Sequence, residues 1–316
     1  MAVAEVEIEA PDIGAYRKGS AGIPYAVSLA APEPGSHVVI TALTHGNELC
    51  GAHALIALLE RGIRPCRGRL SLAFVNVAAY ARFDPGRPRG SRYVDEDMNR
   101  LWDPRLLDGP RRSVELDRAR ELRPLIEDAD WLLDLHSMQQ AARPLLLSGL
   151  TAKGRRLARA MGYPATVVAD AGHRNGARMR DFGAFADPAS PKTAMLVECG
   201  QHWAKASCEV AIATCRQFLS ALEVVEPGRL DALGPPPPPA PQQVIEVTDT
   251  VVVEHGPFRF TEFYGGLETI AEAGTVIAYD GGVPVRTPYE DCVLVMPSQH
   301  LARGLTAVRL GRIAGP

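Results

Sequence analysis

Short, almost continuously apolar runs alternate with segments of helical period over the first two-thirds of the chain. The apolar runs predict buried strands at residues 37–43, 70–77, 131–135, 144–148, 165–169 and 193–198. Apolar residues spaced three and four apart predict helices at residues 47–61, 113–129, 151–161 and 203–224. We expect Pro124 to kink or split the second helix. The alternation predicts an α/β fold, with a mixed, mostly parallel sheet flanked by helices.

The pattern changes at residue 234. Residues 234–241 (GPPPPPAP) predict a stiff, extended proline-rich linker, although such a run also suits a proline-binding partner domain. Residues 242–316 alternate short apolar runs with glycine turns, which predicts a smaller all-β C-terminal domain. We therefore expect a large α/β domain over residues 1–233, the linker over residues 234–241 and a β-rich domain over residues 242–316.

Composition and charge narrow the choice of partners. The 316 residues are 46% hydrophobic and 22% charged, with a formal charge of −3, so the chain should be globular without a nucleic-acid partner. No apolar run approaches the roughly 18 residues of a membrane helix, and the acidic start does not resemble a signal peptide. Six cysteines without a Cys-x-x-Cys pair predict reduced thiols and a cytoplasmic location. The oligomeric state stays open, a homo-oligomer included.

Three polar side chains are expected at one edge of the predicted sheet. His45 and Glu48 follow the first strong strand, and their spacing of three lets both reach one point. His136 ends another predicted strand, so it lies at the same edge. The pair alone also fits an exposed histidine and a helix-start glutamate. Together the three predict a catalytic zinc site with one Zn²⁺ per chain, and Asp134 is placed to orient His136.

Further polar residues surround this predicted site. Glu198 ends the strand at residues 193–198, and beside a zinc ion it is suited to act as the general base. Alternation turns Cys199 away from Glu198, so we expect a small buried thiol. Arg92, Asn99 and Arg100 lie within nine residues and suit the fixing of a carboxylate and the polarising of a carbonyl. A charged surface loop is the alternative for these three.

Four motifs, HGNE, RYVDEDMNR, DLHS and VECG, occur in this order from residue 45 to residue 200. They resemble the succinylglutamate desuccinylase/aspartoacylase family, zinc-dependent deacylases related to metallopeptidases of the carboxypeptidase A type. The resemblance covers residues 37–224 and implies a zinc carboxypeptidase-like fold, with the family's β-rich C-terminal domain fitting the remainder more loosely. It also implies the roles of the motif residues: His45, Glu48 and His136 as zinc ligands, Glu198 as the base, Arg92 at the scissile carbonyl, and Asn99 and Arg100 at the substrate's α-carboxylate.

Outside the motifs the resemblance is weaker. The residues after DLH, SMQQ, differ from the family's short polar tracts, so substrate choice does not carry over. Residues 172–185 are expected to cover the pocket, where Arg178 or Arg180 would bind a second acidic group of the substrate. The alternative for this segment is a solvated basic loop. Tyr289 resembles a tyrosine that reaches the substrate in aspartoacylases, with an ordinary half-buried tyrosine as the alternative. Two further histidines near the pocket in sequence are secondary candidates, His173 and His202.

These observations predict a zinc-dependent hydrolase that cleaves the amide of a small N-acyl amino acid or a related acyl compound. In this prediction Glu198 activates a metal-bound water and Arg92 stabilises the oxyanion. One alternative is a metallocarboxypeptidase acting on peptides, which needs an open groove. Another is a ligand-binding protein with a vestigial zinc site. The presence of Glu198 beside all three ligands argues against the latter, because a metal-binding scaffold needs no base.

Overall fold

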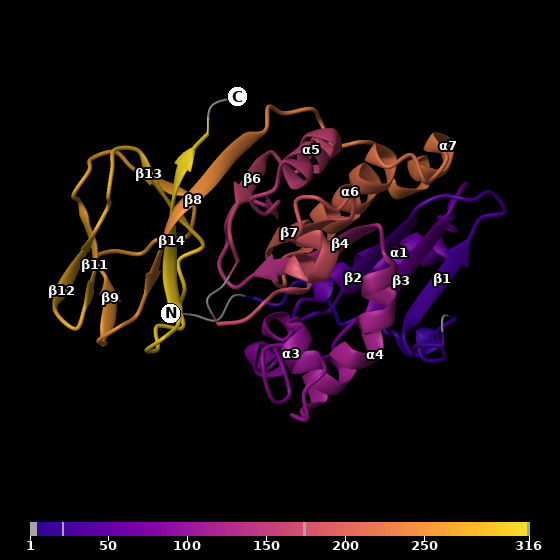
Figure 1. Ribbon diagram of the computed structural model, residues 1–316, viewed down its shortest axis with the longest axis horizontal. Helices are drawn as coiled ribbons and strands as arrows, with labels where there is room; N and C mark the ends of the chain where they lie inside the picture. Colours follow the sequence, from indigo (N-terminus) through magenta and orange to yellow (C-terminus); the bar gives the residue numbers. More distant parts are fainter. Residues whose placement is uncertain (1–4, 21, 173–174, 315–316) are drawn as a thin grey trace.

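A mixed sheet forms the centre of the protein in the computed structural model, which describes residues 5–20, 22–172 and 175–314 (Figure 1). Its first part has the strand order β1-β3-β2-β4-β7-β5-β6. The strands before the C-terminal region are β1 (Ala26–Ala30), β2 (His37–Ala42), β3 (Arg69–Phe74), β4 (Trp131–Met138), β5 (Leu145–Leu147), β6 (Thr166–Ala169) and β7 (Thr193–Gln201). β2 pairs parallel with β3 and β4, and β4 pairs parallel with β7, whereas β1 and β5 are antiparallel to β3 and β7. The predicted mixed, mostly parallel sheet is confirmed.

Helices cover both faces of this sheet, in agreement with the sequence pattern (Figure 1). On one face lie α1 (Leu49–Glu60), α5 (Ala152–Met161) and α6 (Lys205–Ala221), which bury one apolar cluster against the strands. On the other face, α3 (Pro104–Leu107) and α4 (Val114–Asp128) bury a second. The short helices are α2 (Val77–Tyr80), α7 (Pro227–Leu230), η1 (Gly14–Tyr16), η2 (Pro88–Ser91), η3 (Met98–Arg100), η4 (Met179–Asp181), η5 (Gly183–Phe185) and η6 (Asp231–Leu233).

Two local predictions need correction. α4 is one helix with Pro124 inside it, so the expected split is wrong. The buried residues Leu116 and Leu122 before the proline and Ile126 after it share one apolar cluster, and this packing stabilises the helix across the lost hydrogen bond. α1 begins at Leu49, two residues later than predicted, and Gly62 follows its end with a φ of 66°, a conformation that favours glycine.

The C-terminal region is all-β, as expected, and its strands pair antiparallel with one another. β8 (Gln243–Val252), β14 (Thr306–Ile313), β13 (Cys292–Val295) and β10 (Glu268–Ile270) continue the central sheet, because β8 also pairs in parallel with β6. β9 (Phe258–Phe260), β11 (Val276–Asp280) and β12 (Val283–Arg286) form a smaller sheet. Residues 235–242 contain neither helix nor strand. Strands from before and after this stretch belong to the same sheet, because β6 pairs with β8. The division into domains at residues 234–241 therefore stays a proposal.

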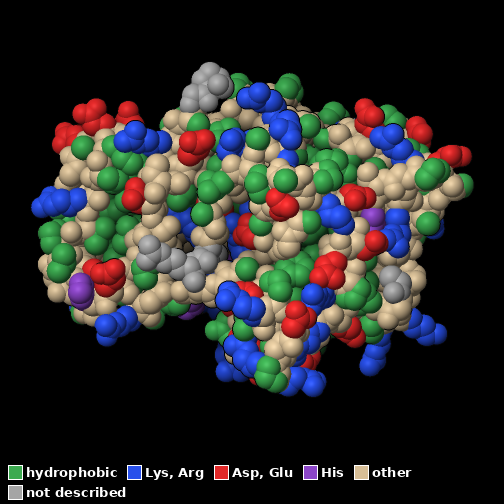
Figure 2. All heavy atoms as spheres, in the orientation of Figure 1, with side chains coloured by type: hydrophobic (Ala, Val, Ile, Leu, Met, Phe, Trp, Pro, Cys, Tyr) green, Lys and Arg blue, Asp and Glu red, His purple; other side chains and the backbone are tan. Residues whose placement is uncertain are grey.

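The surface carries charges of both signs. In Figure 2, acidic and basic side chains are interspersed with hydrophobic ones over the visible face, in keeping with the formal charge of −3. Within the described ranges, no helix combines the length and the apolar character needed to cross a membrane. All six cysteines are free thiols.

Candidate active site

The turn from β2 into α1 places the first two candidate ligands. Leu43 has a φ of 61°, and the amide of Gly46 donates a hydrogen bond to the carbonyl of Arg92 at 3.1 Å. A Cβ at Gly46 would collide with the backbone of residues 79 and 80, so only glycine fits this turn. His45 and Glu48 lie in this turn, before α1 begins at Leu49. The predicted helix over residues 47–61 had placed Glu48 inside the first helical turn.

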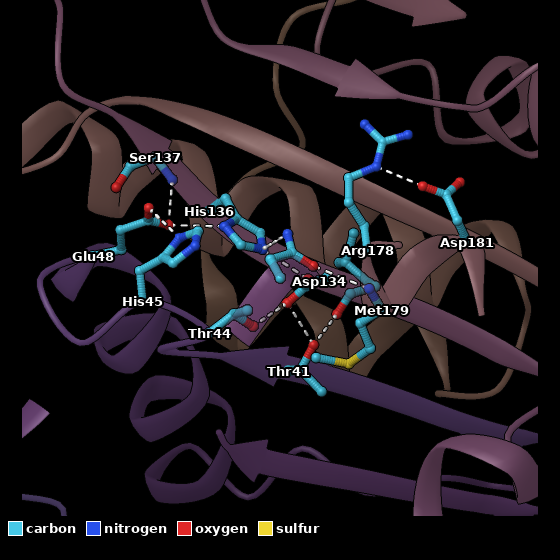
Figure 3. A network of polar contacts seen from close by, with 12 residues as sticks. Thr41, Thr44, His45, Glu48, Asp134, His136, Ser137, Arg178, Met179 and Asp181 are labelled. Atoms are coloured by element: carbon cyan, nitrogen blue, oxygen red, sulfur yellow. Dashed lines mark hydrogen bonds and ion pairs between the residues drawn. The ribbon is translucent and has the colours of Figure 1, made fainter. Parts of the chain in front are cut away.

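His45, Glu48 and His136 form a buried group whose donor atoms lie within 4.8 Å of one another (Figure 3). Glu48 stands between the two imidazoles. Its Oε1 is 2.7 Å from His45 Nδ1, and its Oε2 is 2.9 Å from His136 Nδ1. The three residues predicted as metal ligands are thus brought together with one nitrogen of each histidine facing the shared carboxylate.

The other nitrogen of each histidine faces a second carboxylate. His136 Nε2 is 2.7 Å from Asp134 Oδ2, as expected, and His45 Nε2 is 2.9 Å from Asp97 Oδ1. Asp134 is itself held by two hydroxyl donors, Thr41 at 2.8 Å and Thr44 at 2.9 Å. A carboxylate behind each imidazole is typical of metal-binding histidines, because it fixes the tautomer and the ring orientation.

The local charges oppose the effects of burial. Burial would raise the pKa of Glu48, but His45 and His136 hold it well below its usual range. Burial would lower the pKa of His136, but Asp134 and Glu48 raise it well above its usual value. In the absence of a metal, positive charge on His136 is therefore favoured, beside the carboxylate of Glu48.

Glu198 lies beside His136 because β4 and β7 pair in register, with His136 opposite Glu198. Its side chain lines the cavity, yet it is only 8% exposed, and Oε2 has no hydrogen-bond partner among the described residues. Burial raises the pKa of Glu198 to about 8, and the nearby carboxylate of Glu48 contributes in the same direction. Cys199 points to the opposite face and is buried in the core, as alternation predicted.

Arg92, Asn99 and Arg100 also line this cavity. Arg92 Nη2 donates to Asp97 at 3.1 Å, and Asp97 and Glu48 raise its pKa against the opposing effect of burial. Asn99 Oδ1 accepts a hydrogen bond from Met179 N at 3.0 Å, which fixes the amide. Arg100 Nη1 donates to the Asn99 carbonyl at 2.7 Å, and burial lowers the pKa of Arg100 to about 10.

The cavity has a volume of about 600 Å³, and part of its wall comes from the C-terminal region. β14 contributes Arg309, which is 4% exposed and whose Nε lies 3.6 Å from Asp170 Oδ2. The loop between β13 and β14 contributes a further stretch, Met296 to His300. On the sheet side, the register pair Leu147 and Leu196 gives the cavity an apolar wall close to Glu198.

Arg178 lines the cavity, but its guanidinium is already engaged. Its Nη atoms donate to Asp170 at 3.0 and 2.8 Å, and its Nε donates to Asp181 at 2.5 Å. Arg180 pairs with Asp181 and donates to two backbone carbonyls. The alternative of a solvated basic loop is therefore wrong for both buried arginines, and direct contact of Arg178 with a substrate stays a prediction.

The structure does not bring Tyr289 to the cavity. Its ring lies 3.9 Å from the guanidinium carbon of Arg312, and its hydroxyl is hydrogen-bonded to Thr248. Tyr289 and Arg312 line a separate pocket on the C-terminal region. The short motif around Tyr289 misled the prediction because it sits in a turn whose direction only the tertiary fold determines.

Sequence reasoning missed three residues of the site or gave them too little weight. Asp97 is the last of three consecutive acidic residues, 95–97, and nothing in the spacing singles it out. Arg309 belongs to a strand whose pairing with β8 is remote in sequence. His202, a secondary candidate, lines the cavity, whereas His173 lies outside the described residues.

Comparisons with known proteins agree with this geometry. The succinylglutamate desuccinylase/aspartoacylase catalytic domain matches residues 34–221. The human N-acyl-aromatic-L-amino acid amidohydrolase (carboxylate-forming) is 35% identical over 121 residues, which are 35% of this chain and 36% of that protein. The match thus spans about a third of the curated relative's length.

Solved structures with similar folds cover almost the whole chain. A succinylglutamate desuccinylase/aspartoacylase from Rhodobacter sphaeroides has a TM-score of 0.65 at 18% identity, covering 93% of this chain and 90% of that one. Succinylglutamate desuccinylase from Vibrio cholerae has a TM-score of 0.65 at 17% identity, covering 92% and 86%. The product-bound ectoine utilization protein EutE (DoeB) from Ruegeria pomeroyi scores 0.62 at 18% identity, covering 90% and 87%. At such identities the likeness shows the fold, while the catalytic-domain match extends over more than half of the sequence. The chain belongs to the succinylglutamate desuccinylase/aspartoacylase family.

Proposed function

We propose that this protein is a zinc-dependent amidohydrolase that cleaves the amide of small N-acyl amino acids, with Glu198 as the general base. One observation carries the proposal. Glu198 is a buried carboxyl with an unpartnered oxygen, and it lies one strand away from His136 in a group of three metal donors. A protein that only binds a metal would not need a second carboxyl that is buried and has an oxygen without a hydrogen-bond partner.

The donor set suits a catalytic zinc ion. Two imidazole nitrogens and one carboxylate are the ligands of several hydrolytic zinc sites, which keep a further position for water or substrate. His45, Glu48 and His136 would hold the metal, with Asp97 and Asp134 fixing the two imidazoles. When bound, Zn²⁺ supplies a Lewis acid that acidifies water and polarises a carbonyl.

The side chains around the metal donors transfer the proton and stabilise the negative charge that develops on the carbonyl oxygen. Glu198 accepts a proton from the attacking water and returns it to the nitrogen of the leaving amine, which balances the hydrolysis. The raised pKa of Glu198, about 8, suits a group that must both take and give a proton near neutral pH. Arg92, held by Asp97, offers its guanidinium to the carbonyl oxygen as negative charge develops there.

Asn99 and Arg100 are proposed to bind the carboxylate of the amino-acid part. They lie next to each other on η3 and line the same cavity as the metal donors. A guanidinium can form two parallel hydrogen bonds with a carboxylate, which sets the orientation of the substrate. This pairing favours substrates with a free carboxylate over their amides.

The shape of the cavity supports a small substrate rather than a peptide. Its volume of about 600 Å³ falls in the range of small-molecule sites, and the C-terminal region forms one wall. The human relative's name refers to N-acyl aromatic amino acids, and the apolar wall of Leu147 and Leu196 suits uncharged groups as well. A cytoplasmic location, the absence of nucleic-acid and membrane partners, and homo-oligomer formation stay predictions from the sequence.

Release of free amine from a panel of N-acyl amino acids tests the proposal. The panel pairs acetyl, succinyl and benzoyl groups with aspartate, glutamate and phenylalanine, and short unblocked peptides form a separate arm. We expect turnover of at least one N-acyl amino acid, its loss on chelation and its return with zinc. Turnover of peptides alone would instead indicate a carboxypeptidase. Zinc binding with no turnover of either class would favour the vestigial site.

A further inference from the structure

His202 is a buried histidine at the cavity that the proposed reaction has not used. The chain after β7 folds across the end of β4, where the His202 amide donates to the Met138 carbonyl at 2.8 Å. Trp203 Nε1 donates to the Asn47 carbonyl at 3.1 Å and anchors the same segment to the turn before α1. These contacts hold His202, only 1% exposed, in the cavity wall that also contains the three metal donors.

Ser137 contacts one nitrogen of the His202 ring. Ser137 Oγ is 2.8 Å from His202 Nδ1, and in the described chain this is the only hydrogen bond of that hydroxyl. When the hydroxyl donates to Nδ1, the ring hydrogen lies on Nε2, and this is the tautomer that the role inferred below requires. His202 Nε2 is buried without a partner among the described residues, and the residue lines the cavity.

The surroundings keep this imidazole neutral. Burial lowers the pKa of His202 to about 3, with Arg92, His45 and His136 acting in the same direction and Glu48 opposing them. The Ser137 amide donates to Glu48 Oε2 at 3.1 Å, which ties the Ser137–His202 pair directly to the metal-donor group. A neutral imidazole can donate one hydrogen bond to a developing oxyanion without becoming an acid itself.

We propose that His202 is a further catalytic residue, whose Nε2–H donates a hydrogen bond to the oxygen of the scissile carbonyl in the transition state. This inference rests on the proposed amide hydrolysis. Ser137 is the positioning residue that fixes the tautomer. Carboxylate binding is assigned to Asn99 and Arg100 on η3, whereas His202 contacts Ser137, the residue that follows the candidate metal donor His136.

Nitrogen-15 NMR of the imidazole rings tests the tautomer independently of turnover. In the metal-free and the zinc-loaded protein, the His202 signals, identified by their loss in His202→Gln, should show a neutral ring protonated at Nε2 from pH 5 to 8. A phosphonate analogue of an N-acyl amino acid should shift the Nε2–H resonance. A ring protonated at Nδ1, or a resonance that ignores the analogue, would overturn the inference.

Kinetics separate a catalytic role from a structural one. His202→Phe should lower kcat by about 10²-fold, the usual effect of losing one oxyanion donor, with KM changed little and one zinc per chain retained. His202→Gln keeps an N–H donor and should recover part of the rate, and Ser137→Ala should fall between parent and His202→Phe. Three results in His202→Phe would each contradict a role at the carbonyl oxygen: a kcat equal to that of the parent, a rise in KM without a fall in kcat, or a loss of zinc.

The chain provides a matched control at the opposite end of β2. His37 is also buried, and its Nε2 lies 2.8 Å from Ser71 Oγ, but this pair is remote from the cavity-lining residues. Ser71→Ala should keep the parent kcat and KM, so a drop equal to that of Ser137→Ala would count against a specific effect. If no N-acyl amino acid is turned over at all, the proposed function fails, while the NMR result still decides the state of His202.

Discussion

Two carboxyl groups in the active site have opposite affinities for protons. The pKa of Glu48 is held well below its usual range by two histidines, while burial raises that of Glu198 to about 8. In the proposed mechanism, the same residue type therefore serves as a charged metal donor in one position and as a proton acceptor and donor in the other. The environment, and not the amino acid, assigns the two roles.

The raised pKa of Glu198 predicts a pH-dependent effect on stability in the metal-free protein. A protonated carboxyl is favoured in the folded state, so its contribution is present below the unfolded pKa of about 4.5 and is lost as the pH rises through about 8. Glu198→Gln, which stays neutral, should therefore gain stability over the parent as the pH rises from 5 to 8.5. Urea unfolding with a chelator measures this difference, and a constant difference across that range would be inconsistent with the raised pKa.

Asp97 and Asp134 each support one imidazole, and this predicts their effect on metal affinity. Asp97→Asn and Asp134→Asn should each weaken zinc binding by roughly 10- to 100-fold, because the histidine loses the carboxylate that orients it. Competition with a fluorescent chelator measures the affinity. Asp103→Asn, at an exposed helix cap away from the cavity, is the control and should bind zinc as the parent does. If both Asp97→Asn and Asp134→Asn bound zinc as tightly as the parent, these carboxylates would not support the metal-binding histidines.

At the scale of elements, the turn between β2 and α1 is the most constrained part of the site. A side chain at Gly46 would meet backbone atoms of Tyr80, Ala79 and Ser91, none of which can move without shifting its own element. Gly46→Ala should destabilise the fold by a few kcal/mol, as expected for a backbone clash, and should reduce zinc content by displacing His45 and Glu48. Gly90→Ala, where a Cβ meets open space, provides the control. Parent stability and parent zinc content in Gly46→Ala would show that the turn adapts.

The elements that carry the motifs were predictable, and the reasons are physical. Continuous apolar runs predicted the buried strands, and polar residues near their carboxyl ends indicated the candidate metal donors His45, Glu48 and His136, which the structure brings together. β1 was missed because it is a short, half-exposed edge strand without a strong apolar pattern. Asp97 and Arg309 were missed because their positions depend on loop paths and strand pairings that local sequence does not encode.

At the scale of the whole molecule, the C-terminal region completes both the sheet and the cavity. β8 pairs with β6 over four residues, and one apolar cluster includes Leu145, Leu147 and Leu196 together with Ile245 and Val293. The cavity wall likewise combines both parts of the chain. The proline-rich stretch at residues 234–241 marks a change of sequence character, while the hydrogen bonds and the core run across it.

This continuity predicts the outcome of truncation. A protein ending at residue 241 would expose the free edge of β6 and the apolar side chains that β8 and β13 cover. We expect it to aggregate or to lose its cooperative unfolding transition, whereas the full chain should unfold in a single transition. Thermal unfolding with circular dichroism and light scattering makes the comparison. A soluble, cooperatively folding fragment of residues 1–241 would show that the two parts are independent domains.

The most direct test of the whole account is a paired measurement of zinc and turnover in Glu198→Gln. Glutamine keeps the size of the side chain but cannot accept the proton. We predict that the variant retains one zinc per chain by elemental analysis while kcat on the best N-acyl amino acid falls by roughly 10²–10⁴-fold. Turnover at the parent rate would show that Glu198 is not the base, and loss of the zinc would show that it is a ligand, so that either result contradicts the proposed enzyme.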